Sequence, residues 1–427
     1  MAKGKRKKKQ NSRATKVIVI IVLVVIIALI ATGAYLYAFK RDVFDDVLSR
    51  IERIFGADSD TSGGNTGGDN TGGDNTGGDN TGGDTTGGDN TGGGKENVIV
   101  NGELSIHFLE PGNANAGDCV YIKAGETDIL VDAGSRKSSV STIKKYLDDY
   151  VKDGVLEYVI ATHADTDHIA GFAASDGIFS LYECKTIIDF ARTNKTTDIY
   201  NEYVLNRQAE ETAGAKHYTA LDCVKETNGA KKTYDITAEI SITFLYQEFY
   251  EKNSADENNY SVCFMLKHGE RNFLFTGDLE EAGEKSLVKS NDLPEVELFK
   301  AGHHGSKTSS NDVLLSVIKP KIVCVCCCAG SVEYTQNLEN TFPTQAFIDR
   351  VAKYTDRVYV TTVMPRLEKN DKDRYVNTEY ELLNGNIAVV SDKEGVTVKC
   401  SHSDTILKDT EWFKNNRTCP EAWKTAA

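Results

Sequence analysis

The run from Val17 to Phe39 contains no charged residue and is rich in Val, Ile and Leu. At about 1.5 Å of helix rise per residue it would extend roughly 35 Å, which is enough to cross a bilayer. Residues 1–16 are basic and contain no acid, so the positive-inside rule predicts a cytoplasmic tail. A cleaved signal peptide is the alternative, but its apolar region would be shorter. We expect a single-pass anchor over residues 17–39 in the cell membrane, with the C-terminal domain extracellular.

Two segments separate this apolar run from the rest of the chain. Residues 40–55 place apolar side chains at helical spacing, which predicts a juxtamembrane helix. Residues 56–96 are dominated by a repeat of Thr-Gly-Gly-Asp-Asn. A segment of this composition cannot bury a core and is typical of a flexible linker. Folding into a compact domain is therefore expected only over residues 97–427.

The pattern of apolar residues in this domain mixes strands with helices, which indicates the α/β class. Strands are predicted over residues 104–109, 120–124, 128–132, 156–162, 186–190, 240–246, 261–266, 272–276, 296–300, 322–328, 358–363, 386–391 and 396–400. Helices are predicted over residues 138–150, 198–212, 279–289, 313–318 and 344–352. The run 322–328 contains four cysteines, which we interpret as small apolar residues of a core strand. A metal or redox centre in this run is the less favoured alternative.

The formal net charge of the whole chain is −14, although its first sixteen residues are basic. An acidic domain does not attract a polyanion over long distances. A nucleic acid could be held only by a local patch or by metal ions.

The segment Thr162–His168 packs two histidines and two aspartates directly after an apolar strand. Close carboxylates repel each other unless a cation lies between them. His163 and Asp165 are spaced to bind one metal ion, and the adjacent Asp167 and His168 to face a second. A polar surface loop is the alternative, but the chain has only eight histidines, so we predict a metal site here.

Three other strand ends carry candidate residues. Asp278 follows a strand and a glycine, where a helix N-cap is its ordinary role; near the metal loop it becomes a candidate bridge between two ions. His303 and His304 follow another strand, and either one can complete the second metal shell. Asp132 also ends a strand and could orient a metal-bound histidine. The polar residues after the histidine pair offer donors for a phosphate, or else form a helix cap: Ser306, Lys307 and Thr308.

These motifs resemble the metallo-β-lactamase superfamily, whose HxHxDH signature corresponds here to His163–His168 with Asp165 in place of the second histidine. That variant is similar to the hydrolase domain of ComEC-type competence proteins. The segments 106–118, 129–134, 258–261, 275–280 and 300–309 agree with it in type and order. The chain differs in its longer opening loop, Glu110–Asp118, and in Phe342-Pro343, where relatives often have His-Pro.

The resemblance implies an αββα sandwich with a dinuclear site for Zn²⁺ or Mn²⁺. We expect His163 and Asp165 to hold one ion, Asp167, His168 and His303 the other, and Asp278 to bridge them. The candidate catalytic residues are Asp167, His304 and Lys307, of which His304 or Lys307 would stabilise the leaving group or grip the phosphate.

The expected function is a membrane-anchored, metal-dependent phosphodiesterase or nuclease. Its predicted partners are a phosphodiester, with nucleic acid as one candidate, and the membrane through one N-terminal helix; no obligate protein partner is inferred. The alternatives are a phosphoesterase for cell-envelope polymers or small extracellular phosphoesters, and a tethered binding module without catalysis.

Overall fold

The computed structural model of the protein describes residues 104–424. The predicted tail, anchor, juxtamembrane helix and repeat linker lie outside these residues. No helix within residues 104–424 combines the length and apolarity that a membrane span needs.

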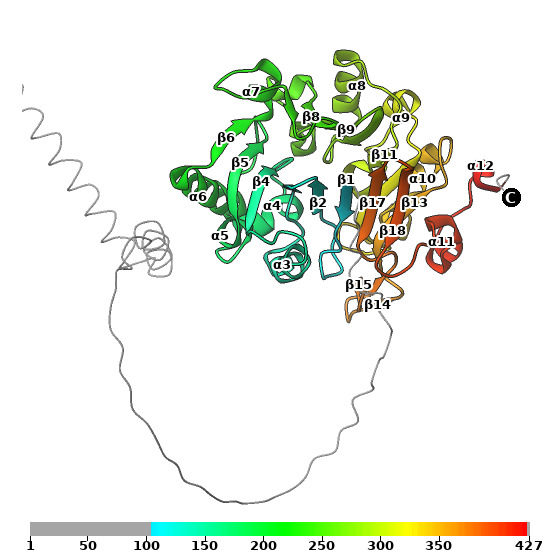
Figure 1. Ribbon diagram of the computed structural model, residues 1–427. Helices are drawn as coiled ribbons and strands as arrows, with labels where there is room; N and C mark the ends of the chain where they lie inside the picture. Colours follow the sequence, from blue (N-terminus) through cyan, green and yellow to red (C-terminus); the bar gives the residue numbers. More distant parts are fainter. Residues whose placement is uncertain (1–103, 425–427) are drawn as a thin grey trace, which may run out of the picture. The chain divides into compact units, whose positions relative to one another are not determined.

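Two eight-stranded sheets form the centre of the domain (Figure 1). The first has the order β18 (Gly395–Cys400), β17 (Ile387–Asp392), β1 (Leu104–Phe108), β2 (Val120–Ala124), β3 (Thr127–Val131), β4 (Val155–Ile160), β5 (Glu183–Asp189) and β6 (Lys216–Thr219). The second has the order β16 (Glu381–Leu382), β13 (Val358–Val363), β12 (Ile322–Ala329), β11 (Leu298–Lys300), β10 (Arg271–Phe275), β9 (Phe264–His268), β8 (Ile240–Phe244) and β7 (Thr233–Asp235). Parallel and antiparallel pairs occur in both sheets.

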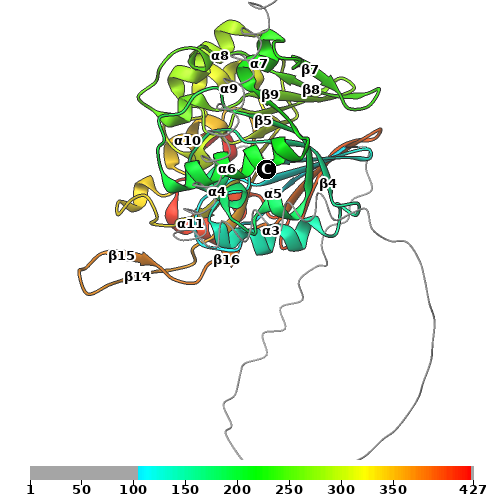
Figure 2. The same ribbon diagram turned by 90° about the vertical axis from the view of Figure 1, so that its left-hand side faces the viewer.

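Helices accompany both sheets. The first group is α3 (Val140–Leu147), α4 (Thr166–Ala173), α5 (Ile178–Leu181), α6 (Asp198–Ala213) and α7 (Ala220–Lys225). The second is α8 (Glu281–Ser290), α9 (Asp312–Ile318), α10 (Gln345–Val351), α11 (Glu411–Asn416) and α12 (Glu421–Lys424). A hairpin of β14 (Leu367–Lys369) and β15 (Tyr375–Asn377) projects from the body (Figure 2).

Alternation along the inner strands explains why the two sheets pack face to face. Phe273 and Phe275 of β10 belong to the core that also contains side chains of the first sheet, whereas Leu274 packs in the core under α8, α9 and α10. Successive strand residues point to opposite faces, so a strand that is apolar on both must be covered on both. The predicted α/β class and two-sheet core are therefore confirmed.

The strand β12 shows the same two-sided burial and contains the four clustered cysteines. Cys324 and Cys326 face the core between the sheets, and Val323 and Val325 face the helices. All eight residues of β12 are buried. The prediction of a core strand is confirmed.

Candidate metal centre

The candidate site lies where strands of both sheets end. In the first sheet β3 and β4 are parallel, and Asp132 and the Thr162–His168 segment follow them. In the second sheet β10 and β11 are parallel, and Asp278 and His304 follow them. The carboxyl ends of adjacent parallel strands lie at the same edge of a sheet, so residues far apart in sequence meet there.

The predicted metal loop is only partly a loop. Asp165 is the N-cap of α4, so Asp167 and His168 lie in the first turn of this helix. The backbone around them is tightly packed: a Cβ atom added to Gly134 would come within 1.5 Å of the Asp167 carbonyl oxygen. Only glycine allows this approach, which fixes the start of α4 against the turn after β3.

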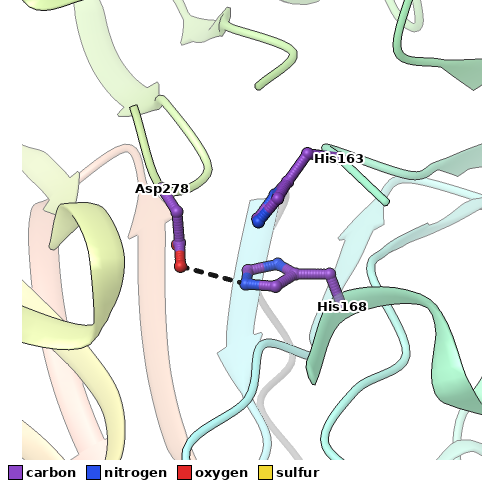
Figure 3. A group of neighbouring side chains, drawn as sticks. All are labelled: His163, His168 and Asp278. Carbon is purple, nitrogen blue, oxygen red and sulfur yellow. Dashed lines mark hydrogen bonds and ion pairs between the residues drawn. The ribbon is translucent and has the colours of Figure 1, made fainter. Parts of the chain in front are cut away.

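Donor atoms of Asp167, His168, Asp278 and His304 form a cage of overlapping groups of three. The Asp278 Oδ2 atom lies 3.2 Å from His168 Nε2 (Figure 3) and 3.2 Å from His304 Nε2. The His304 Nε2 atom lies 3.3 Å from Asp167 Oδ2. A tetrahedral ion with bonds of about 2.0–2.1 Å separates its ligands by about 3.3–3.4 Å. The three separations of 3.2–3.3 Å match this ligand spacing of a divalent metal ion.

His163 extends the site on one side. Its Nε2 atom lies 3.5 Å from Asp165 Oδ2, so the predicted pair is adjacent. His163, His168 and Asp278 also offer atoms within 4.8 Å of one another (Figure 3). The other Asp165 oxygen, Oδ1, forms an ion pair with Lys195. Asp165 thus presents one oxygen toward His163 and the other toward a lysine.

The two adjacent histidines take different positions from those we predicted. Both have left-handed backbones, with φ of 45° for His303 and 53° for His304. His304 Nδ1 donates to the Cys326 carbonyl oxygen at 2.9 Å, which directs Nε2 into the cage. His303 instead lies 3.2 Å from Glu280 and contributes no atom to the metal-binding groups found among residues 104–424. The geometry places His304, not His303, with the candidate ligands.

Asp132 lies in the position expected of an orienting residue. Its Oδ2 atom is 2.8 Å from His168 Nδ1 and accepts a hydrogen bond from the Thr162 hydroxyl at 2.7 Å. Its Oδ1 atom accepts a hydrogen bond from the Thr162 backbone N–H, also at 2.7 Å. Its φ of 57° is left-handed, a strained conformation that aspartate tolerates better than most residues. Because Asp132 occupies Nδ1, the Nε2 atom of His168 is left to face the cage.

Two buried charges were absent from the predicted site. Lys300, the last residue of β11, forms ion pairs with Asp118 and with Asp278 Oδ1, the latter at 3.1 Å. Its Nζ atom also donates to the Gly277 carbonyl oxygen at 3.0 Å. Asp118 ends the long opening loop and lies 3.3 Å from His304 Nδ1. A buried lysine is rare unless it is paired, which was a usable signal at the end of an apolar strand.

The charged groups of the site stabilise the ionised forms of one another. Burial alone would raise the pKa of Asp278, but His304, Lys300 and His168 hold it well below its ordinary value. Burial alone would lower the pKa of His168, but Asp278, Asp132 and Asp118 hold it well above its ordinary value. The carboxylates are therefore held ionised, which is the form that binds a cation.

Three buried polar atoms that lack hydrogen-bond partners in the described part of the chain indicate whether a metal ion fits the site. Asp118 Oδ1, His163 Nε2 and His304 Nε2 are buried and have no hydrogen-bond partner among the described residues. Leaving such an atom unsatisfied costs about 1–3 kcal/mol, so several together need a ligand. Imidazole nitrogen and carboxylate oxygen are suitable donors for Zn²⁺ or Mn²⁺. The residues present fit a divalent metal.

The predicted phosphate-binding residues are not arranged around the cage. Thr308 donates to Glu280 at 2.7 Å, and Ser306 bonds to Thr308. Lys307 is directed to Asn340 Oδ1 at 3.3 Å. All three precede α9 by several residues, so they do not form its first turn.

A pocket of about 480 Å³ opens beside the cage. It is lined by Arg136, Asp165, Thr166, Asp167, Asn258, Asp278, His303 and Tyr334. Sequence reasoning did not single out Arg136 or Tyr334, because neither belongs to a recognisable motif. The pocket gives a substrate access to the candidate ligands.

Comparison with known proteins shows what the segments around this site are similar to. A family model described as the metallo-beta-lactamase superfamily matches residues 112–180 and 254–329. Recombination protein 2 of Haemophilus influenzae is 25% identical over 254 residues, which cover 59% of this chain and 27% of that protein. Competence protein ComA of Neisseria gonorrhoeae is 25% identical over 259 residues, which cover 60% of this chain and 31% of that protein.

Among solved structures, the metallo-beta-lactamase fold protein YhfI of Bacillus subtilis aligns with a TM-score of 0.36 and 12% identity. The alignment covers 61% of this chain and 96% of YhfI. The chain spans less than a third of the length of Recombination protein 2 and of Competence protein ComA. The matched segments include the loop after β4, the turn after β10 and the histidine pair. The matched segments therefore correspond to a metallo-β-lactamase domain, and the chain is similar over this region to the two proteins named above.

Proposed function

We propose that this domain is a metal-dependent phosphodiesterase with a dinuclear site. The observation that carries the proposal is the buried cage of Asp167, His168, Asp278 and His304, whose spacing fits a divalent ion. His163 and Asp165 supply donors for a second ion, with Asp278 between the two positions.

Divalent ions bound here would polarise a phosphoryl oxygen and make a water molecule nucleophilic at neutral pH. The chain's own residues fix the ligands for this task. Asp132 holds His168 through Nδ1, and the Cys326 carbonyl oxygen holds His304 in the same way. Lys300 holds Asp278 through Oδ1 and leaves Oδ2 toward the cage. This support positions the donors before any ion binds.

We assign leaving-group contact to His303 rather than to His304. His303 lines the pocket, and its Nδ1 atom lies 3.2 Å from Glu280 Oε1. Glu280 is well suited to hold the ring: burial would raise its pKa, but hydrogen bonds from His303, Asp256 and Thr308 lower it to about 2. With Nδ1 engaged, Nε2 is the ring nitrogen that faces a leaving oxygen.

We further propose that the domain acts outside the cell, tethered by residues 17–96. The support is the uncharged run Val17–Phe39 after a basic segment. Protease treatment of intact cells should release the domain at the glycine-rich repeat. Full protection of the domain would contradict this topology.

The activity is tested with the purified full chain in detergent, supplied with Mn²⁺ or Zn²⁺. Bis-p-nitrophenyl phosphate, single-stranded DNA and RNA are the substrates, and Asp278→Asn is the matched control. We expect hydrolysis by the wild type and a loss of at least about a hundredfold in the control, because one ligand serves both ion positions. Metal-loaded wild type that cleaves none of these substrates would refute the proposal.

A further inference from the structure

A short segment after β12 crosses the mouth of the site. The carboxylate of Glu333 accepts a hydrogen bond from the Ala116 backbone at 2.8 Å and forms an ion pair with Arg136. The hydroxyl of Tyr334 donates to Asp167 Oδ2 at 2.8 Å. The segment follows a strand of the second sheet, while its three partners belong to the first half of the chain. Glu333 therefore anchors the segment and places Tyr334 beside a candidate metal ligand.

The ring of Tyr334 is poorly buried for its size. It is 56% exposed, although its hydroxyl is engaged inside the pocket. Its ring centre lies 5.7 Å from that of Phe342, which lies 5.8 Å from His303 and 6.2 Å from His304. Tyr334 lines the pocket, and Phe342 neighbours the Tyr334 ring and both histidine rings.

The cations near the pocket are already paired. Arg136 is the only lysine or arginine among the lining residues, and its guanidinium contacts Glu333 and the Ser135 carbonyl oxygen. Lys195, which borders Asp165, is paired with that carboxylate. A duplex is normally held by several lysines and arginines that follow its phosphates. Single-stranded ligands can instead gain affinity from bases that stack on aromatic side chains.

The pocket volume of about 480 Å³ is typical of sites for small ligands. We propose that Tyr334, supported by the neighbouring ring of Phe342, forms a stacking face for a nucleobase next to the scissile phosphate, so that the site selects dinucleotides and single-stranded ends over duplex DNA. This inference rests on the proposed phosphodiesterase function. Tyr334 is thus a specificity-determining residue, and the phosphate would be bound by the ions that the candidate ligands hold.

The first test compares two substrates that share the scissile bond: a dinucleotide and its analogue with one abasic position. The full chain is assayed with Mn²⁺ as wild type, Tyr334→Ala and Leu338→Ala. Leu338 is a matched control, because it is a large exposed side chain of the same loop and does not line this pocket. We expect Tyr334→Ala to raise the KM of the dinucleotide about tenfold, because one base that stacks on an aromatic ring contributes about this much affinity. The KM of the abasic analogue should stay unchanged.

The second test does not need turnover. A dinucleotide with 2-aminopurine and a methylphosphonate linkage should lose fluorescence when its base stacks on Tyr334. We expect the loss in wild type and in Tyr334→Phe, which keeps the ring, and not in Tyr334→Ala. Equal metal content in all variants, measured by elemental analysis, would exclude an effect on the ligands.

The outcomes separate the two proposals. An equal KM change for both substrates, or fluorescence loss that persists in Tyr334→Ala, would overturn the stacking face. Preferred cleavage of duplex DNA would overturn the selectivity. A wild type that quenches 2-aminopurine but hydrolyses no phosphodiester would refute the proposed function and still support a nucleobase-binding face.

Discussion

Replacing Lys300 with methionine tests whether the site is held together by its internal cation. The side chain is 3% exposed and contacts the carboxylates of Asp118 and Asp278. Methionine is also unbranched, is one atom shorter, and removes the charge and the hydrogen-bond donors of the ammonium group. In the absence of metal, two buried carboxylates would then lose their shared partner.

The expected cost follows from burial and distance. Two unit charges about 3 Å apart interact by roughly 5 kcal/mol at an effective dielectric constant of about 20. Removing one partner of a buried pair costs about 3–5 kcal/mol, because the other charge is left uncompensated. An ion held by Asp278 would compensate part of this charge, so we expect a smaller loss when the site is saturated with Mn²⁺. A loss of this size is a large part of the usual stability of a domain.

The measurement is the free energy of unfolding of the full chain in detergent, with a chelator and with Mn²⁺. The matched control is Lys195→Met, because Lys195 also pairs with an aspartate of the site but is 31% exposed. A pair this exposed contributes about 0–1 kcal/mol. The reasoning would be refuted if, in chelator, Lys300→Met and Lys195→Met lost the same stability.

Further predictions concern the ligands and a buried carboxyl. Asp132→Asn should weaken metal binding about 10–100-fold, measured by competition with a chromogenic chelator, because His168 loses its anionic partner. His304→Ala should lose tightly bound metal and His303→Ala should keep it; elemental analysis that gave the reverse would restore our original assignment. Burial raises the pKa of Glu284 to about 7, so the folded protein favours the protonated carboxyl. The stability that this carboxyl contributes is present below about pH 4.5 and is lost as the pH rises through 7. Glu284→Gln should remove this dependence, seen as a stability difference from wild type that changes between pH 5 and pH 8.

Much of the fold was predictable because strands alternate and end at polar or glycine-rich turns. The helix α4 was not, although it carries two candidate ligands. All residues from His168 to Ala173 are buried, so the helix has no polar face along that stretch. A helix that is apolar all round shows no 3.6-residue period, and a sequence pattern cannot distinguish it from a loop or strand.

The sequence predicted the site residues that directly follow strands. It did not predict which side chains point into the cage. His303 and His304 are adjacent and chemically identical, and only their left-handed backbones send one ring to the cage and the other to Glu280. Tyr334 was missed for a different reason. Its place depends on Glu333 reaching Arg136, a contact between residues far apart in the chain, which no local pattern records.

The two lysines at the site share a geometry that bears on the reactivity of the ions. Lys300 takes Oδ1 of Asp278 and leaves Oδ2 to the imidazoles, and Lys195 takes Oδ1 of Asp165 and leaves Oδ2 to His163. A carboxylate that shares its charge with an ammonium group gives less of it to a metal. Partners behind the ligands tune a metal in this way. The ions would therefore keep more of their charge for a phosphoryl oxygen, which would let an acidic domain attract the proposed phosphodiester at this site.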